Sequence, residues 1–208
     1  MGKTRIRALV LDYGGVISKP QNPDNVNNIL QILSQDDNDF RNVYQSKREN
    51  YDDGQLSGEE YWLSILQHYG LDQNDSKVTN LIQEDVKSWT QINDPMIQFI
   101  KESRGKLHKL AIISNMTMDV LAFMKKHFQW LELFDELIFS CEFGKNKPDT
   151  RIYEACLSSI EIPAQECLFV DDSVKNVDGA MKSGMKVIHF KSFMQFRLEL
   201  DQNYRLSQ

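Results

Sequence analysis

The amino-acid sequence predicts an α/β fold in which a parallel sheet carries helices on both of its faces. Three observations predict it. Short apolar runs alternate with helical patterns along much of the chain, as in a parallel sheet. These runs are apolar at every position, which is typical of strands buried on both faces. Residues 18–93, in contrast, contain helical patterns only. We therefore predict a Rossmann-like core, residues 1–17 and 94–208, with residues 18–93 inserted as a small α-helical cap.

Composition and charge exclude several classes of protein. The 208 residues suffice for one core domain with a small insert. A net charge of −6 is unfavourable for a nucleic-acid partner, and three cysteines without paired spacing indicate a reducing compartment. The first apolar run is too short for a signal sequence or a membrane span. We expect a cytoplasmic protein, a monomer or weak dimer, that binds neither nucleic acid nor membrane.

The first strand is predicted at residues 8–11. It ends on Asp12, and Gly14 and Gly15 follow. The carboxyl ends of strands are where open α/β sheets place ligands, and glycine allows the backbone to turn and to approach a ligand closely. This stretch alone leaves two interpretations open, a functional carboxylate or a solvated residue in a turn.

Four amphipathic helices are predicted in the insert. The third begins at a capping box formed by Ser57 and Glu60, and Gly70 ends it. The aromatic side chains fall at helical spacing and are predicted to be core. Lys47 and Arg48 are predicted to be solvated rather than to reach a cleft. The four helical patterns span residues 26–33, 40–51, 61–69 and 78–89.

Strands and helices alternate after residue 94. Asp149 is predicted to cap a helix, Gly184 to end one, and the tail from Ser192 to be partly helical. The predicted strands are residues 110–113, 137–139, 167–170 and 186–190. The predicted helices are residues 96–103, 120–128, 152–157 and 174–183.

Polar residues follow three of the predicted strands. They are Asp12, the pair Ser114 and Asn115, and the pair Asp171 and Asp172. Since parallel strands place their carboxyl ends at one edge of the sheet, we expect these side chains to lie close together. Carboxylates that are close together repel one another unless a cation lies among them. Oxygen ligands of this kind suit Mg²⁺, which we predict as the cofactor.

Lys147 adds a fixed positive charge, and Ser114 adds a hydroxyl group. A carboxylate, a divalent ion, a lysine and a hydroxyl together suit phosphoryl transfer, in which positioning and charge neutralisation dominate. Asp12 can itself attack phosphorus and form an aspartyl-phosphate.

Four segments resemble, in the same order, the four motifs of the haloacid dehalogenase (HAD) superfamily. They are residues 12–16, residues 114–115, residues 147–149, and Asp171 and Asp172 with Asn176, Gly179 and Ala180. The helical insert resembles the C1 cap of the phosphatase-like members. Within the superfamily, the chain looks most like bacterial sugar-phosphate phosphatases and the phosphatase half of soluble epoxide hydrolases. The resemblance implies a Mg²⁺-dependent phosphatase that acts on a small phosphorylated metabolite, such as a sugar phosphate.

The resemblance also implies the catalytic and phosphate-binding residues. Asp12 is the nucleophile, and Lys147 neutralises both this carboxylate and the phosphoryl oxygens. Ser114 and Asn115 hold the transferring phosphoryl group.

For the metal, the resemblance implies three ligands and one supporting carboxylate. The ligands are Asp12, the backbone carbonyl of Gly14, and Asp172. Asp171 lies in the outer shell or binds through water.

The sequence departs from the HAD pattern at Gly14, where hydrolytic members have a second aspartate that serves as general acid and base. Such groups contribute about 10²–10⁴-fold in rate. Cap carboxylates are candidates for a replacement, namely Glu49, Asp52 and Asp53.

Two alternatives to a phosphatase remain open. A non-catalytic homologue would bind a phosphorylated ligand or a partner protein. A 2-haloacid dehalogenase also lacks the second aspartate, but such enzymes need no metal, and the pair Asp171 and Asp172 is more typical of a metal site.

Overall fold

In the computed structural model, residues 2–207 are described, apart from the side chains of residues 37 and 38. Five parallel strands form the main sheet of this part of the chain, in the order β4-β3-β2-β5-β6. The first predicted strand is therefore central, and Leu9 pairs with Leu110 on one side and with Leu168 on the other. The strands are β2 (Ala8–Leu11), β3 (Lys109–Ser114), β4 (Glu136–Phe139), β5 (Cys167–Asp171) and β6 (Lys186–His189).

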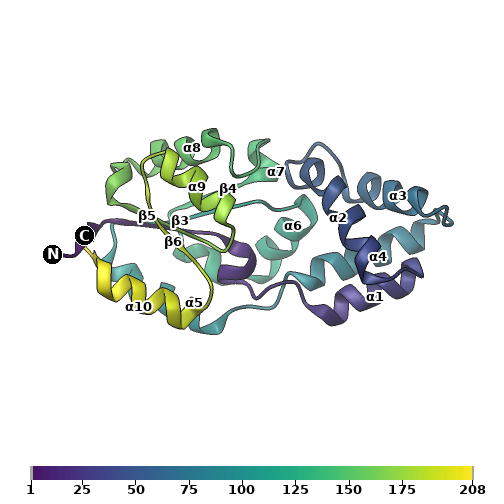
Figure 1. Ribbon diagram of the computed structural model, residues 1–208, viewed down its shortest axis with the longest axis horizontal. Coiled ribbons are helices and arrows are strands. Elements are labelled where there is room, and N and C mark those ends of the chain that lie inside the picture. Colours follow the sequence, from purple (N-terminus) through teal and green to yellow (C-terminus); the bar gives the residue numbers. More distant parts are fainter. Residues whose placement is uncertain (1, 208) are drawn as a thin grey trace.

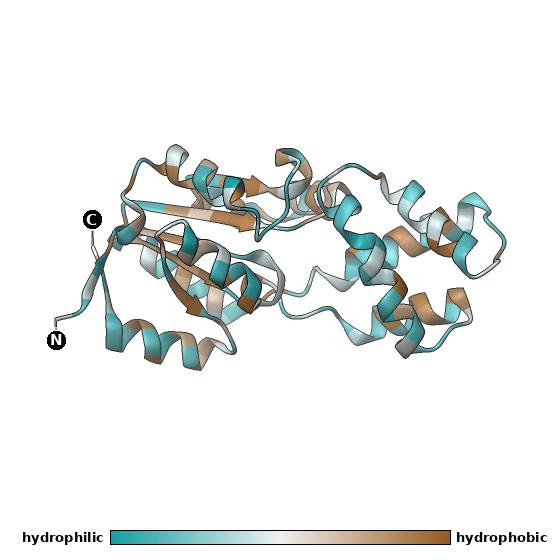
Figure 2. Ribbon diagram, turned by 45° about the horizontal axis from the view of Figure 1, so that its top comes forward, coloured by the Kyte–Doolittle hydropathy of each residue, from teal (hydrophilic) through white to brown (hydrophobic). Residues whose placement is uncertain are grey.

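Helices cover both faces of this sheet (Figure 1), which confirms the predicted fold class. Each face has its own hydrophobic core, because successive strand residues point to opposite faces: Leu9 and Leu11 belong to one core, Ala8 and Val10 to the other. Figure 2 shows the strands as apolar segments between helices of mixed polarity. The first core packs against α5 (Asp94–Ser103), α6 (Met118–His127) and α10 (Phe193–Asn203). The second packs against α8 (Thr150–Ile160) and α9 (Val174–Lys182).

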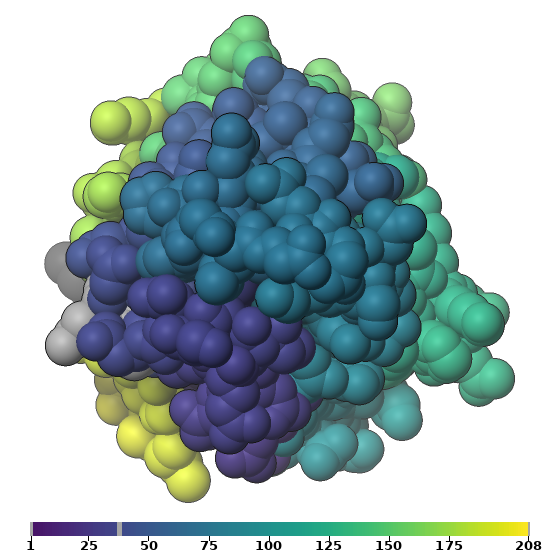
Figure 3. All heavy atoms as spheres, turned by 90° about the vertical axis from the view of Figure 1, so that its right-hand side faces the viewer, coloured from purple at the N-terminus to yellow at the C-terminus, as the bar shows by residue number. Residues whose placement is uncertain are grey.

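Residues 18–93, called the cap below, contain four helices that lie beyond the carboxyl ends of the strands (Figure 1). They enclose a third hydrophobic core, which includes the fully buried Trp62. An antiparallel bridge between Ser18 and Ile92 joins the two segments that lead into and out of the cap. Seen from the cap end, these helices cover much of the core (Figure 3). They are α1 (Pro23–Leu33), α2 (Asp37–Asp52), α3 (Gly58–His68) and α4 (Asp75–Ser88).

The predicted helix ends have clear physical causes. Ser57 and Glu60 form the capping box at the start of α3. Gly70 and Gly184 follow α3 and α9 with φ of +63° and +85°, in the left-handed region that favours glycine. The Asp149 side chain accepts a hydrogen bond from the backbone N–H of Arg151 and so caps α8.

The structure differs from the prediction at both ends of the chain. The tail does form α10, but it continues into a strand, β7 (Tyr204–Leu206), which pairs in parallel with β1 (Thr4–Ile6). Strands of three residues are too short to show a period, and their pairing joins opposite ends of the sequence. The short helix α7 (Ser140–Phe143) was also not predicted. Among the described residues, no helix combines the length and apolarity needed to cross a membrane.

Candidate active site

Asp12 lies directly after the central strand β2, at the carboxyl edge of the sheet. Its backbone N–H donates to the carbonyl of Val170 in β5, at 2.9 Å, which extends the sheet by one residue. Its side chain accepts a hydrogen bond from the backbone N–H of Tyr13 at 2.7 Å. Asp12 is only 6% exposed, so the strand and the turn fix this carboxylate at the bottom of the site.

Gly14 and Gly15 form the turn after Asp12. Gly14 has φ −63° and ψ 125°, angles that any residue adopts, whereas Gly15 has φ +72°. A β-carbon on Gly15 would collide with the carboxylate of Asp172. The glycine at position 15 therefore permits both the turn and the close approach of Asp172.

Lys147 lies between two of the predicted carboxylates. Its Nζ is 2.8 Å from Oδ1 of Asp12 and 2.7 Å from Oδ2 of Asp171. The lysine is almost fully buried, so little water screens these ion pairs. The structure thus brings residues from three separate segments into one charged cluster. The strand ends predicted that Asp12 and Asp171 would lie close together.

Asn115 positions Lys147 through the backbone. The side-chain oxygen of Asn115 accepts from the backbone N–H of Lys147 at 2.7 Å, and its Nδ2 donates to the carbonyl of the same residue at 3.0 Å. Both ends of the amide thus bind the backbone of Lys147. Its neighbour Ser114 is buried at the end of β3, and its hydroxyl donates to the Asn115 carbonyl at 3.4 Å.

Asp171 and Asp172 differ strongly in their surroundings. Asp171 is fully buried, and its two oxygens accept hydrogen bonds from Lys147, Asn176 and the backbone N–H of Ser173. Asp172 is exposed on the cavity side. Among the described residues, no other residue donates a hydrogen bond to its side chain.

The pKa values of the cluster reflect burial and crowded charge. Burial raises the pKa of Asp12 to about 7; Lys147 acts against this shift, and Asp171 adds to it. Burial, together with the charge of Asp171, also raises the pKa of Asp172. For Lys147, burial alone would lower the pKa, but Asp12 and Asp171 raise it above the usual value. Lys147 therefore stays protonated, and its single positive charge does not balance the negative charge of the carboxylates.

The donor set fits a divalent cation. Oxygen atoms of Asp12, Asp171 and Asp172 lie within 4.8 Å of one another. Three carboxylates face one lysine, which leaves an excess of negative charge that Mg²⁺ would offset. Such an ion typically binds one or two carboxylates together with water and phosphate oxygens.

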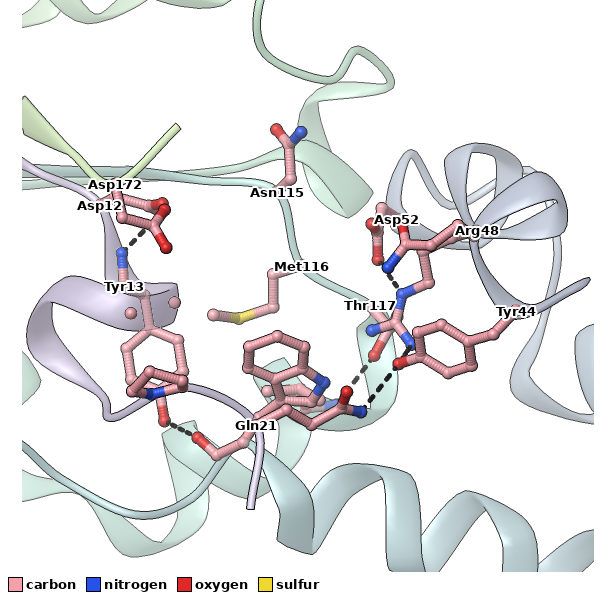
Figure 4. Close-up of a pocket in the computed structure, with 16 residues that line it drawn as sticks. Asp12, Tyr13, Gln21, Tyr44, Arg48, Asp52, Asn115, Met116, Thr117 and Asp172 are labelled. Atoms are coloured by element: carbon pink, nitrogen blue, oxygen red, sulfur yellow. Dashed lines mark hydrogen bonds and ion pairs between the residues drawn. The ribbon is translucent and has the colours of Figure 1, made fainter. Parts of the chain in front are cut away.

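A cavity of about 280 Å³ lies between the cap and the core (Figure 4). Asp12, Tyr13 and Asp172 lie on one side of it and Tyr44, Arg48 and Asp52 on the other, and the Met116 side chain extends between them. Lys147 and Ser114 are not among the lining residues. The lining comprises Asp12, Tyr13, Gly14, Gly15, Pro20, Gln21, Tyr44, Gln45, Arg48, Asp52, Trp89, Asn115, Met116, Thr117, Val120 and Asp172.

Arg48 is the centre of a buried polar network in the cap, so the prediction that it is solvated is wrong. Its Nε donates to Oδ1 of Asp52 at 2.8 Å, and an Nη donates to Oδ2 of Asp85 at 2.9 Å. The guanidinium also lies over the rings of Tyr44 and Tyr51. The neighbouring acids and aromatic rings make burial of this cation tolerable, which sequence spacing alone did not show.

Of the three cap carboxylates considered from the sequence, Asp52 alone lines the cavity. One oxygen binds Arg48, and no hydrogen bond to the other occurs among the described residues. Burial raises the pKa of Asp52, while Arg48 acts in the opposite direction. Glu49 and Asp53 instead border a separate groove beside the loop of residues 145–149.

The last turn of α2 is tied to the core, which fixes Asp52 relative to the site. The Ser140 hydroxyl donates to the backbone carbonyl of Asp52, and the Asn146 side chain donates to that of Glu49. The hydroxyl of Tyr51 donates to Asp119 at 2.7 Å. These bonds come from three core segments.

Sequence reasoning missed most of the cavity wall. The Trp89 indole was predicted to be core. It is half buried and packs against the first core, and it also lines the cavity beside Gly14. Met116 and Val120 follow the predicted Ser114 and Asn115 closely, and that position was the available signal. Tyr13 lies next to Asp12 in the same way.

The sequence also matches a known family. Residues 24–190 match the family described as haloacid dehalogenase-like hydrolases. The matched segment contains Ser114, Lys147 and Asp172 and begins after Asp12. It covers well over half of the chain.

Curated relatives match over parts of their own length. The chain is 32% identical over 108 residues to a sesquiterpene phosphatase of Aspergillus oryzae, which covers 51% of this chain and 55% of that protein. It is 28% identical over 107 residues to a phosphatase of Mycobacterium tuberculosis, which covers 51% and 49%. A drimenol cyclase of Aspergillus calidoustus is 24% identical over 89% of this chain, but over 34% of its own length. The chain thus spans about a third to a half of these relatives.

Solved structures share the fold at low identity. A HAD family enzyme of Bacteroides thetaiotaomicron superposes with a TM-score of 0.78 at 19% identity, covering 90% of this chain and 94% of that one. A variant of that enzyme in complex with magnesium and inorganic phosphate gives a TM-score of 0.75, also at 19% identity, and covers 89% and 94%.

Proposed function

The chain belongs to the haloacid dehalogenase-like hydrolases, and we propose that it is a Mg²⁺-dependent phosphatase that forms an aspartyl-phosphate on Asp12. The observation that carries this proposal is the position of Asp12. It is a buried carboxylate, paired with Lys147 at 2.8 Å, next to the open Asp172, and at the end of a cavity large enough for a small ester. The substrate is a small phosphate monoester.

The metal would be held by Asp12, Asp172 and the backbone carbonyl of Gly14. We assign Asp172 as the direct ligand because its side chain is exposed to the cavity and no other described residue donates to it. Asp171 is a supporting residue because its oxygens already bind protein donors. When bound, Mg²⁺ neutralises the negative charge of the carboxylates and of the phosphoryl oxygens.

Asp12 and Lys147 carry out the first step. A carboxylate oxygen of Asp12 attacks phosphorus, the bond from phosphorus to the ester oxygen breaks, and the alcohol leaves. Lys147 holds Asp12 in place and offsets charge on the phosphoryl oxygens. The backbone at Asn115, which lines the cavity, would hold the phosphoryl group, and the Ser114 hydroxyl would join it by turning away from the Asn115 carbonyl. The Asn115 side chain positions the lysine.

Asp52 supplies the proton that Gly14 cannot. In its protonated form it gives a proton to the leaving oxygen, and the resulting carboxylate accepts one from the water that attacks the aspartyl-phosphate. Phosphate leaves, and Asp12 is regenerated. Three observations support this role: Asp52 lines the same cavity as Asp12, one of its oxygens is free, and burial raises its pKa.

Two relatives support the reaction class. The proteins from Aspergillus oryzae and Mycobacterium tuberculosis are both named as phosphatases. The fold neighbour was also crystallised with magnesium and inorganic phosphate. The names of these proteins support the reaction class and not a particular substrate.

Phosphate release from a panel of monoesters, with and without Mg²⁺, tests the proposal. We expect turnover that requires Mg²⁺, stops with a chelator and is abolished in Asp12→Asn. Absence of turnover across the panel, together with ligand-induced thermal stabilisation, would instead favour a non-catalytic binding protein. Halide release from a 2-chloro acid without Mg²⁺ would favour a dehalogenase.

A further inference from the structure

Apolar side chains form part of the cavity wall next to Asp12. Tyr13, Met116 and Val120 are buried core residues that also line the cavity, and Trp89 is half buried there. The polar Nε1 of Trp89 is buried and has no hydrogen-bond partner in the part of the chain that the structure describes, so the ring offers carbon atoms to the cavity. Resting on the proposed phosphatase function, we propose that the substrate is a phosphate monoester of an apolar alcohol, with a hydrocarbon body and no second charged group.

Several polar side chains in the cavity wall already have hydrogen-bond partners within the protein. Gln21 donates to the hydroxyl of Tyr44 and to that of Ser88, and the Tyr44 hydroxyl donates to Asp85 at 2.6 Å. The Thr117 hydroxyl accepts from the backbone N–H of Val120 and caps α6. A sugar needs several free donors and acceptors to replace its hydration. The bonds of Gln21, Tyr44 and Thr117 within the protein leave fewer of them for a ligand.

The charge of the cap wall is unfavourable for a second phosphate or carboxylate. Arg48 is the one cation among the described residues that line the cavity. Its charge is balanced by the buried Asp85 and, when ionised, by Asp52, so the cluster of these three side chains carries no net positive charge. A second anionic group on the substrate would find no unpaired cation there. This observation argues against bisphosphates and phosphorylated acids.

The leaving group would meet Trp89 first. The indole lies beside Gly14, two residues after the nucleophile. It contributes a flat apolar surface next to the place where the alcohol part of the ester would lie. Apolar contact there stabilises the bound substrate because it removes apolar surface from water. At about 280 Å³, the cavity is suited to a body of modest size.

A matched pair of substrates tests this inference in the wild-type protein with Mg²⁺. Cyclohexylmethyl phosphate has the six-membered ring and the primary ester of glucose 6-phosphate, but no hydroxyl groups. We expect its kcat/KM to exceed that of glucose 6-phosphate by at least about tenfold, the usual value of a few apolar contacts in a pocket. p-Nitrophenyl phosphate, whose leaving group needs no proton, reports general phosphatase activity.

Two methionines provide a matched pair of variants. Met116 lines the cavity, whereas Met118, two residues later, is 49% exposed on α6. Met116→Ala should lower kcat/KM for cyclohexylmethyl phosphate by about tenfold and leave glucose 6-phosphate less affected; Met118→Ala should alter neither. Trp89→Gln should produce the same selective loss. Thermal unfolding checks that each variant is folded.

Binding provides a readout without turnover. 2-Cyclohexylethylphosphonate has a CH2 group in place of the ester oxygen of cyclohexylmethyl phosphate and therefore cannot be hydrolysed. It should raise the thermal midpoint more than the corresponding phosphonate analogue of glucose 6-phosphate. Turnover of p-nitrophenyl phosphate with a preference for glucose 6-phosphate would overturn the inference and leave the phosphatase proposal intact. If none of the three esters is turned over, the phosphatase proposal fails, and the inference fails with it.

Discussion

The indole ring of Trp89 lies 3.6 Å from the point where a β-carbon on Gly14 would stand. Position 14 is where the HAD resemblance expects the general acid. In this chain it carries no side chain, and an apolar ring lies beside it. The proton donor for an alcohol leaving group therefore has to come from another wall of the cavity, and Asp52 lines that wall with a free oxygen.

Asp52→Asn is expected to slow the hydrolysis of an ester most strongly when its leaving group needs a proton. For an alkyl ester such as cyclohexylmethyl phosphate we expect kcat to fall by about 10²–10⁴-fold, and for p-nitrophenyl phosphate only slightly. Glu49→Gln and Asp53→Asn are matched controls from the same helix end, since neither side chain lines the cavity. An equal loss for both esters would show that Asp52 has a structural role only.

Gly14→Asp is expected to rescue Asp52→Asn. The backbone angles at Gly14 suit any residue, and a β-carbon would make an ordinary contact with Trp89, so the variant should fold. In the Asp52→Asn background we expect kcat for the alkyl ester to rise by at least about tenfold, because a carboxylate is restored near the leaving oxygen. In the wild-type background the gain should be small. A large gain there would contradict the assignment of Asp52.

Much of this fold could be predicted because it follows from local patterns. The strand at residues 8–11 is apolar at every position, and parallel topology then places Asp12 beside Asp171 without further information. Arg48 could not be predicted in the same way. Its burial depends on Asp85, which lies in another helix, and on the aromatic rings around it. Contacts between distant segments leave no periodic signal in a single sequence.

The same limit applies to the cavity wall. Trp89 belongs to the end of α4 by spacing, and its position beside Gly14 depends on how the cap lies against the core. Asn115 was expected, together with Ser114, to hold the phosphoryl group. Its two hydrogen bonds to the backbone of Lys147 reveal a positioning role that residue type alone did not indicate.

The stabilisation of the protein by Mg²⁺ is expected to depend on pH. The pKa of Asp12, about 7, lies above its usual 3.8. Between these values the folded protein holds a proton that the unfolded chain has released, so without metal the stability falls as pH rises through this window and levels off above about 7. Metal binding requires the carboxylate form, so the gain in thermal midpoint with Mg²⁺ should grow as pH rises through about 7.

Thermal unfolding with Mg²⁺ and with a chelator, from pH 5.5 to 8.5, measures this difference. Asp12→Asn serves as the control, because it removes the titrating group, and its response to Mg²⁺ should be small at every pH. A gain that is the same at all pH values in the wild type would show that Asp12 does not hold the metal.

Arg48→Met is expected to destabilise the cap. It removes the cation that faces the fully buried Asp85 and leaves that carboxylate without its ion pair. Losing one partner of a buried pair costs about 3–5 kcal/mol. Adding Asp85→Asn should recover part of this loss, since the uncompensated charge is removed. Denaturant unfolding of the single and double variants measures the coupling, and additive effects would contradict the network.

Asn115→Ala is expected to reduce catalysis through Lys147. The variant removes both hydrogen bonds to the lysine backbone but keeps the lysine itself. A misplaced catalytic group costs about 10²-fold, so kcat should fall by roughly that factor while KM changes less. Two unmade hydrogen bonds should also lower the free energy of unfolding by about 1–3 kcal/mol.

Asn146→Ala is the matched control for this position. Asn146 is the residue before Lys147, and its side chain donates to the carbonyl of Glu49 in the cap rather than to the lysine. It should therefore lose stability without the loss in kcat. Asn115→Asp keeps the acceptor for the lysine N–H but loses the donor to its carbonyl, so its kcat should lie between wild type and Asn115→Ala. If Asn115→Ala raised KM and left kcat unchanged, Asn115 would contact the substrate instead of positioning Lys147.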